Sequence, residues 1–271
     1  MNNPSLYAAG FLRTGVSPLP IIDVHAHMGQ VYGTSLSMAT AGEMIAVMDR
    51  ENIEAVFCSP HSALFDPGAG NAELESAMAQ YPGRFRGYCA FNPNYPSDMP
   101  GDAKEWIAKG YIGFKFLPEY HRRPIGCPEY ERALRFADAH ALVLLVHTWG
   151  DSPYNSPRQL ARIPEDYPNV TLILGHSAPG ELDAAIALAA QYPRVYLDLC
   201  DIHRHSGIVD RMVAGAGAQK VLFGTDIPWY DPAYCLGSVL FSRISDEEKA
   251  LILYGNAKRI ADRYRSMELE G

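Results

Sequence analysis

The sequence predicts an α/β protein, a single-domain (β/α)₈ TIM barrel, from three observations. Eight short apolar runs recur along the whole chain, and each is followed by a segment with a helical pattern. The starts of successive runs lie about 24 to 33 residues apart, the length of one strand, one helix and two short loops. The runs are continuously apolar, as in parallel strands that are buried on both faces. A length of 271 residues also suits such a barrel, which typically needs about 250.

The expected strands are rich in β-branched and other apolar residues, and several of them end in a polar residue. In chain order they are PLPIIDVHAH ending at His27, EAVFCS (Glu54–Ser59), FRGYCAF (Phe85–Phe91), IGFKFL (Ile112–Leu117), LVLLVHT (Leu142–Thr148), VTLILGHS (Val170–Ser177), VYLDLC (Val195–Cys200) and VLFGTD (Val221–Asp226).

Helix signals lie between these runs. Thr40 and Glu43 have the spacing of a capping box and open the segment AGEMIAVMDREN. The segment Glu181–Gln191 is rich in strong helix formers and begins with an acidic residue, which suits the N-terminal end of the helix dipole. Proline is expected to end three helices in the same way, at Tyr81-Pro82, Tyr167-Pro168 and Tyr192-Pro193.

The same order of elements could also form an open, doubly wound sheet. A closed barrel is favoured because no G-x-G-x-x-G turn follows an early strand, as a dinucleotide-binding sheet would usually show. No linker or low-complexity tract divides the chain, so one domain is expected over residues 1–271, with residues 1–18 as an N-terminal extension. In such a barrel the catalytic groups sit at the carboxyl ends of the strands.

Composition limits the classes of partner. The formal net charge is −8 and no run of basic residues is present, which argues against a nucleic-acid partner. No apolar run approaches the roughly 20 residues of a membrane-spanning helix. The first residues lack the pattern of a secretory signal, and five cysteines without C-x-x-C spacing read as reduced thiols. We expect a cytoplasmic protein with a small-molecule substrate, and the sequence leaves self-association into a homo-oligomer open.

Polar residues collect at the expected strand ends. His25 and His27 share one face of the first strand, and His147, His176 and Asp226 end three later strands. Lys115 lies within the fourth. One alternative is a set of separate, hydrogen-bonded core histidines. The concentration at one end of the barrel favours a metal site instead, because imidazole and carboxylate are ligands that Zn²⁺ prefers.

The motifs DVHAH, GFKFLP, VHTWG, LGHSAPG, FGTD and GNAKRI occur in this order between about residues 20 and 262. Together they resemble the amidohydrolase superfamily, in particular its amidohydrolase-2 branch of metal-dependent TIM-barrel hydrolases and decarboxylases. The resemblance implies that a divalent metal is held by His25, His27, His147 and Asp226. It makes His176 either a catalytic histidine or a ligand to a second metal. It places Lys115 where binuclear members carry a carbamylated lysine.

We expect one metal ion, Zn²⁺ with Mn²⁺ as the alternative, and an unmodified Lys115; a two-metal site remains the other interpretation. Asp226, His176 and Lys115 are the candidate catalytic residues. Metal-assisted hydrolysis of a lactone, amide or related ester is favoured, because decarboxylases of the branch often have Glu where this chain has His25. Decarboxylation or hydration of a carboxylated, ring-derived acid is the alternative, and a non-catalytic metal-binding barrel is a minor one.

The loops that follow the strands supply candidates for substrate binding. Cationic side chains suit a substrate carboxylate, and aromatic side chains suit a flat or apolar body. The candidates on this rim are Arg122, Arg123, Trp149, His203 and Trp229.

Overall fold

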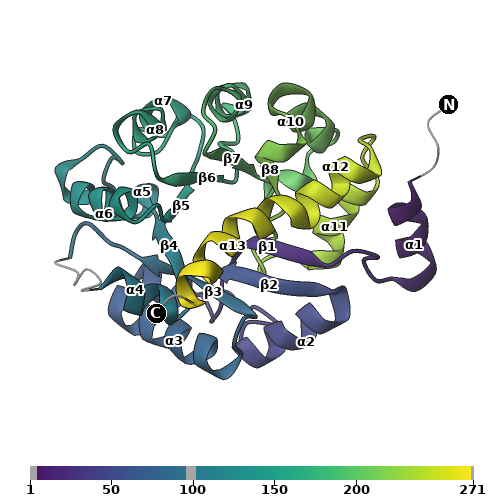
Figure 1. Cartoon of the computed structure of the whole chain (residues 1–271), viewed down its shortest axis with the longest axis horizontal. Helices are drawn as coiled ribbons and strands as arrows, with labels where there is room; N and C mark the ends of the chain where they lie inside the picture. The colour runs from purple at the N-terminus through teal and green to yellow at the C-terminus, as the bar shows by residue number, and fades with distance from the viewer. Residues whose placement is uncertain (1–4, 96–101, 270–271) are drawn as a thin grey trace.

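Strands occupy the centre of the molecule and helices surround them (Figure 1). The computed structural model describes residues 5–95 and 102–269, so both ends of the predicted domain (1–4 and 270–271) lie outside the described residues. The sheet has eight strands in the order β1 to β8. Every neighbouring pair along this order is parallel. The predicted (β/α)₈ barrel is therefore confirmed.

Each predicted apolar run forms a strand, and most bounds differ by only one to three residues. The strands are β1 (Ile21–Ala26), β2 (Ile53–Cys58), β3 (Phe85–Ala90), β4 (Tyr111–Phe116), β5 (Val143–His147), β6 (Thr171–Gly175), β7 (Val195–Asp198) and β8 (Val221–Leu222).

The last strand is much shorter than its predicted run. Its pairing with β7 ends at Leu222, and the chain then turns toward β1. The backbone N–H of Asp226 donates to the carbonyl of His25 over 2.8 Å. Asp226 has a φ of 65°, in the left-handed region, which ends the extended conformation. The barrel therefore closes through a few separate hydrogen bonds rather than through a regular ladder.

Helices follow the strands and cover the outside of the barrel. The longer ones are α1 (Leu6–Thr14), α2 (Ala41–Glu51), α3 (Pro67–Gln80), α6 (Pro128–Ala139), α9 (Leu182–Gln191), α10 (Ile208–Ala216), α11 (Pro232–Leu240) and α13 (Asn256–Leu269). The shorter ones are η1 (His61–Leu64), α4 (Ala103–Ala108), α5 (Pro118–His121), α7 (Pro157–Leu160), α8 (Arg162–Asp166), η2 (Ile202–Arg204), η3 (Ala218–Lys220), α12 (Asp246–Ala250) and η4 (Leu251–Gly255).

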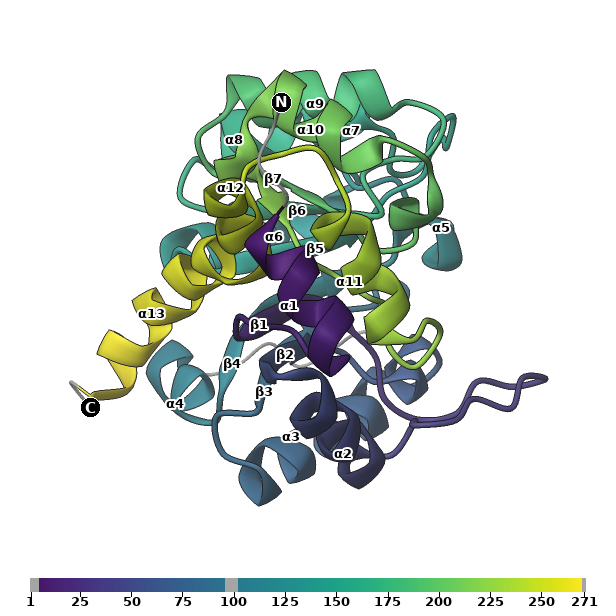
Figure 2. The same cartoon turned by 90° about the vertical axis from the view of Figure 1, so that its right-hand side faces the viewer.

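The predicted helix ends are borne out. Thr40 and Glu43 form the capping box of α2, with both reciprocal hydrogen bonds present. Helices α3, α8 and α9 stop at Tyr81, Tyr167 and Tyr192, each of which precedes a proline. The N-terminal extension contains a helix that the sequence did not predict, α1, which lies on the outer surface of the barrel (Figure 2). Its cap residue, Ser5, donates to Asp246 of α12 over 2.5 Å.

The barrel core is apolar, but buried polar side chains interrupt it on several strands. Asp23, His25, Lys115 and Asp198 are each at most 1% exposed. Burial of such groups is costly unless they bond to one another or to a cation. These buried polar residues are therefore candidates for a functional site inside the barrel.

The five cysteines are free thiols, as expected. No helix in the described part of the chain is long and apolar enough to cross a membrane.

Gly113 of β4 tests how tightly the strands pack. A Cβ atom at this position would lie 1.8 Å from the carbonyl oxygen of Val143 on β5. We expect Gly113→Ala to lower the free energy of unfolding by about 1–3 kcal/mol or more, because the clashing atom belongs to the backbone. Gly126, where a Cβ atom would meet no atom within 4 Å, provides the control. Urea unfolding of the two variants makes the comparison, and equal midpoints would contradict this packing.

Candidate active site

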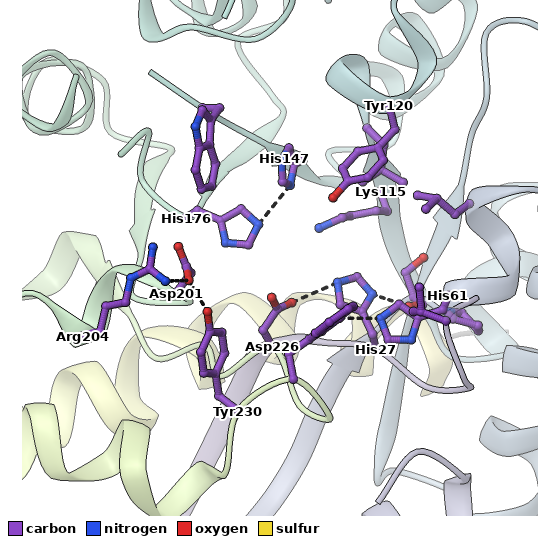
Figure 3. A pocket seen from close by; sticks show the side chains of 17 residues that line it. His27, His61, Lys115, Tyr120, His147, His176, Asp201, Arg204, Asp226 and Tyr230 are labelled. Atoms are coloured by element: carbon purple, nitrogen blue, oxygen red, sulfur yellow. Dashed lines mark hydrogen bonds and ion pairs between the residues drawn. The ribbon is translucent and has the colours of Figure 1, made fainter. Parts of the chain in front are cut away.

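A cavity of about 410 Å³ opens at the carboxyl ends of the strands. Its walls carry most of the side chains that the sequence singled out (Figure 3). They include His27, Lys115, His147, Trp149, His176, Asp226 and Trp229. Apolar and aromatic side chains such as Val31, Leu64, Leu117 and Tyr120 complete the lining. This combination of polar groups on an apolar wall is typical of a small-molecule site.

Hydrogen bonds fix the orientation of both histidines of the first strand. The Nδ1 atom of His25 lies 2.6 Å from a carboxylate oxygen of Asp198. The Nδ1 atom of His27 lies 2.7 Å from the backbone carbonyl of Ser59. Because a carboxylate and a carbonyl can only accept, each Nδ1 carries the proton and donates. In the neutral rings both Nε2 atoms therefore present a lone pair.

These lone pairs point toward Asp226. Its Oδ1 atom lies 3.2 Å from Nε2 of His27 and 3.7 Å from Nε2 of His25. This oxygen is buried and has no hydrogen bond of good geometry among the described residues. Nε2 of His25 already accepts from the amine of Lys115 over 2.7 Å. The Asp226 oxygen and Nε2 of His27, 3.2 Å apart, face each other as two acceptors, which favours a cation between them. Two imidazole nitrogens and one carboxylate oxygen therefore fit a borderline divalent cation.

Burial and charge tune the ionisation of these groups. Burial holds the pKa of His25 well below its usual value, so its ring is neutral. Metal ligands of these types must be a neutral imidazole and an ionised carboxylate. His25 is therefore in the state that cation binding requires.

His147 and His176 pair with each other across the cavity. The Nε2 atom of His176 lies 3.0 Å from Nδ1 of His147 (Figure 3). His176 follows β6 and begins three consecutive residues with positive φ, together with Ser177 and Ala178. This left-handed turn swings the ring of His176 over toward β5. The cluster that includes Asp226 contains His25 and His27 but not His147.

Lys115 is the buried cation of the site. Its Nζ atom lies 2.7 Å from Nε2 of His25, and burial lowers its pKa to about 8. The side chain is held inside the barrel by β4, and its amine reaches the floor of the cavity. It is therefore placed to contact a ligand of the cluster and a bound molecule alike.

Asp198 is a residue of this site that sequence reasoning missed. Its Oδ2 atom accepts from Nδ1 of His25 and, over 3.2 Å, from the backbone N–H of His176. Its Oδ1 atom accepts from the backbone N–H of Cys200 over 3.0 Å. Burial raises its pKa to about 6. A signal was present, because Asp198 interrupts the apolar run VYLDLC just as Lys115 interrupts the fourth strand.

The predicted substrate-binding residues fall into two groups. Trp149 and Trp229 line the cavity, whereas Arg122, Arg123 and His203 do not. Arg122 follows helix α5 as its C-cap with a φ of 52°, in the left-handed region. Arg123 donates from Nε to the side-chain oxygen of Asn94 over 2.8 Å. His203 is buried beneath the rings of two tyrosines. These three side chains are thus placed away from a ligand in the cavity.

A different arginine reaches the cavity. Arg204 contacts Asp201 over 3.0 Å, and the hydroxyl of Tyr230 donates to the same carboxylate oxygen (Figure 3). All three side chains line the cavity. Asp201 has a φ of 61° and is 6% exposed, so it is held firmly beneath Arg204. The arrangement places one guanidinium group at the rim, opposite His27 and His61.

The comparison with protein families agrees with this geometry. The family model described as amidohydrolase matches residues 22–262. The chain belongs to the amidohydrolase-2 family. Among curated proteins, none matches the sequence.

Solved structures share the fold of this amidohydrolase at low sequence identity. A 5-carboxyvanillate decarboxylase from Sphingomonas paucimobilis has a TM-score of 0.67 at 16% identity, over 90% of this chain and 99% of its own. A dihydroxybenzoic acid decarboxylase from a Polaromonas species, with bound manganese, has a TM-score of 0.68 at 17% identity, over 93% and 99%. A probable 2-pyrone-4,6-dicarboxylic acid hydrolase from Acinetobacter baumannii has a TM-score of 0.65 at 16% identity, over 90% and 100%.

Asp198 generates a prediction about cation binding. Asn at this position keeps the size of the side chain but removes the charge, and its amide can reverse the tautomer of His25. Because such partners of metal ligands typically contribute 10- to 100-fold in affinity, we expect Asp198→Asn to weaken Mn²⁺ binding by about that factor. Isothermal titration measures it. Asp183→Asn, at a side chain that is 81% exposed, is the control, and equal affinities in both variants would contradict this role.

Proposed function

We propose that this amidohydrolase is a metal-dependent hydrolase that attacks the carbonyl carbon of a small carboxylated lactone, amide or related ester. The observation that carries the proposal is the convergence of three atoms at the mouth of the barrel. They are two imidazole nitrogens and one carboxylate oxygen that has no hydrogen-bond partner among the described residues. A metal site at an open cavity is typical of catalysis, whereas structural zinc sites are closed. This supports an enzyme rather than a non-catalytic metal-binding barrel.

The proposed ligands of one divalent cation are His25, His27 and Asp226, with His147 as the fourth. When bound, such a cation supplies polarisation of the substrate carbonyl and acidifies water. Zn²⁺ and Mn²⁺ both suit this donor set, and the Polaromonas neighbour holds manganese. The direct contact between His147 and His176 favours one cation over two. Lys115 acts as a positive charge toward the substrate, with an unmodified amine.

Hydrolysis adds one water molecule across the scissile bond. Asp226 accepts the proton of the attacking water at its carboxylate and returns it to the leaving oxygen or nitrogen. His176 orients the water or stabilises the charge that develops on the carbonyl oxygen. The left-handed turn that begins at His176 and the hydrogen bond from its N–H to Asp198 hold the ring in place. The proposed chemistry therefore needs little rearrangement of these side chains.

The cavity suits an anion with a flat body. Trp149 and Trp229 are 40% and 42% exposed, and both line the cavity. Their exposed indole faces can stack against a ring of the substrate. Arg204, which lines the cavity, offers a guanidinium group for the carboxylate. A protein of net charge −8 does not attract anions over long range, so this local charge must provide the recognition.

Decarboxylation of a carboxylated, ring-derived acid is the second candidate. It is favoured by the two neighbours whose names describe decarboxylases of carboxylated aromatic rings. The same residues would then hold the carboxylate and deliver a proton to carbon. The two reactions differ in their products, because hydrolysis incorporates solvent oxygen whereas decarboxylation releases carbon dioxide.

The ligand set can be tested by substitution. We expect His25→Ala, His27→Ala, His147→Ala and Asp226→Asn each to lower the bound metal and the turnover more than 10- to 100-fold, because ligands contribute more than their hydrogen-bonding partners. Elemental analysis and circular dichroism are the measurements. His140→Ala, at the end of α6, is the control. Full metal content in the Asp226 variant, or loss of the fold on metal removal from the wild type, would contradict the proposal.

Arg204 gives a prediction about the substrate. We expect Arg204→Ala to lower kcat/KM on carboxylated lactones or amides by roughly 10- to 100-fold, which corresponds to about 1.5–3 kcal/mol of charged hydrogen bonding. Arg122→Ala should leave it unchanged, because Arg122 does not line the cavity. The same rates are measured on lactones and amides that lack the carboxylate, for comparison.

Reaction in ¹⁸O-labelled water identifies the chemistry. One labelled oxygen in the product acid supports hydrolysis, whereas release of carbon dioxide in its place supports the second candidate. Faster turnover of the neutral analogues would contradict the carboxylate assignment.

A further inference from the structure

A second group of metal-ligating side chains adjoins the cavity. It consists of His25 of β1, His176 after β6 and Cys200 after β7, and all three are buried. One potential ligand atom from each lies within 4.8 Å of the others. The thiol sulfur of Cys200 is 3.3 Å from Nδ1 of His176. Three chemically suitable atoms thus converge from three different strand ends.

The spacing suits a tetrahedral ion. A sulfur at about 2.3 Å and a nitrogen at about 2.0 Å from one zinc ion, at a tetrahedral angle, lie roughly 3.5 Å apart. The observed 3.3 Å between Cys200 and His176 is close to this value. A thiolate with two imidazoles is a softer donor set than two imidazoles with a carboxylate. It selects thiophilic cations such as Zn²⁺ and Cd²⁺ over Mn²⁺.

Both clusters depend on the same nitrogen. Asp198 occupies Nδ1 of His25, so only Nε2 is available to a cation. This atom faces Asp226 in one cluster. His25 is also a member of the other cluster, so the same nitrogen would have to serve a cation there. One nitrogen lone pair binds one cation, so the two sites exclude each other. The amine of Lys115 lies 2.7 Å from this nitrogen. It must move away before a cation can bind at either site.

We propose that His25, His176 and Cys200 form a second, buried cation site that takes thiophilic ions and cannot be filled together with the site at Asp226. The consequence for turnover, inhibition by soft cations, rests on the proposed hydrolase function, whereas binding does not.

Binding at this site converts the Cys200 thiol to a thiolate that bonds to the cation and releases one proton to solvent. Burial raises the pKa of this thiol well above its usual value. The bound cation must therefore supply the charge that stabilises the thiolate in its buried position. No oxidation or reduction takes part in this step.

Cadmium alone is the probe for binding. The partly exposed thiols Cys89 and Cys127 are first replaced by Ser to give the test protein. We expect Cd²⁺ to produce an ultraviolet cadmium–thiolate charge-transfer band that is lost in Cys200→Ser and in Cys200→Ala. The matched control is Cys235→Ser, which removes a buried thiol 3.4 Å from His203 and should keep the band. A band that survives both Cys200 variants, or that disappears with Cys235, overturns the proposal.

The sharing of His25 is tested separately. His27→Ala removes a ligand of the first cluster only and should keep the cadmium band, whereas His25→Ala should abolish it. Cadmium inhibition of the Mn²⁺-loaded enzyme, relative to its own uninhibited rate, should need about tenfold more cadmium or more in Cys200→Ser, because a ligand is lost. Equal inhibition of Cys200→Ser and of the protein that retains Cys200 would overturn the proposal that cadmium inhibits turnover through this site. If no turnover is found, the hydrolase proposal fails while the spectroscopic result stands by itself.

Discussion

The contact between β1 and the segment after β8 closes the barrel and creates the candidate site. The carboxylate of Asp23 is central to this contact. It accepts from the hydroxyl of Thr225 over 2.5 Å and from the backbone N–H groups of His25 and Thr225 over 3.0 and 3.1 Å. The two bonds with Thr225 join residues 202 positions apart in the sequence. Without them, the histidines of the first strand would not face the aspartate of the last.

This arrangement buries several polar groups, and removing them from water costs free energy. Burial raises the pKa of Asp23 to about 7 and that of Asp198 to about 6. Residues in the left-handed region, among them His176, Asp201 and Asp226, add backbone strain that typically costs about 1–3 kcal/mol each. Their hydrogen bonds to neighbouring strands offset part of this cost. The result is a set of donor atoms whose positions are fixed before a ligand arrives, as catalysis requires.

The site divides into regions with different chemistry. The floor carries imidazoles, a carboxylate and an amine, and a thiol adjoins them. The walls carry aromatic rings, and the rim carries the ion pair of Arg204 with Asp201. In the proposed hydrolysis, this division separates the reacting carbonyl from the guanidinium group that would orient the substrate. It also places a carboxylate and a thiol near one imidazole, that of His25.

The sequence by itself determined the strands, their order and the end of the barrel that carries the chemistry. Apolar runs, the H-x-H spacing and proline at helix ends are local features, and they depend on neighbours in the chain. The tertiary structure alone decided which side chains meet. It brought Arg204 rather than Arg122 into the cavity, paired His147 with His176 and placed Asp198 behind His25. The reason is physical: the direction of a side chain beyond a strand end depends on a few backbone dihedrals and on hydrogen bonds from distant strands, and neither is encoded in local periodicity.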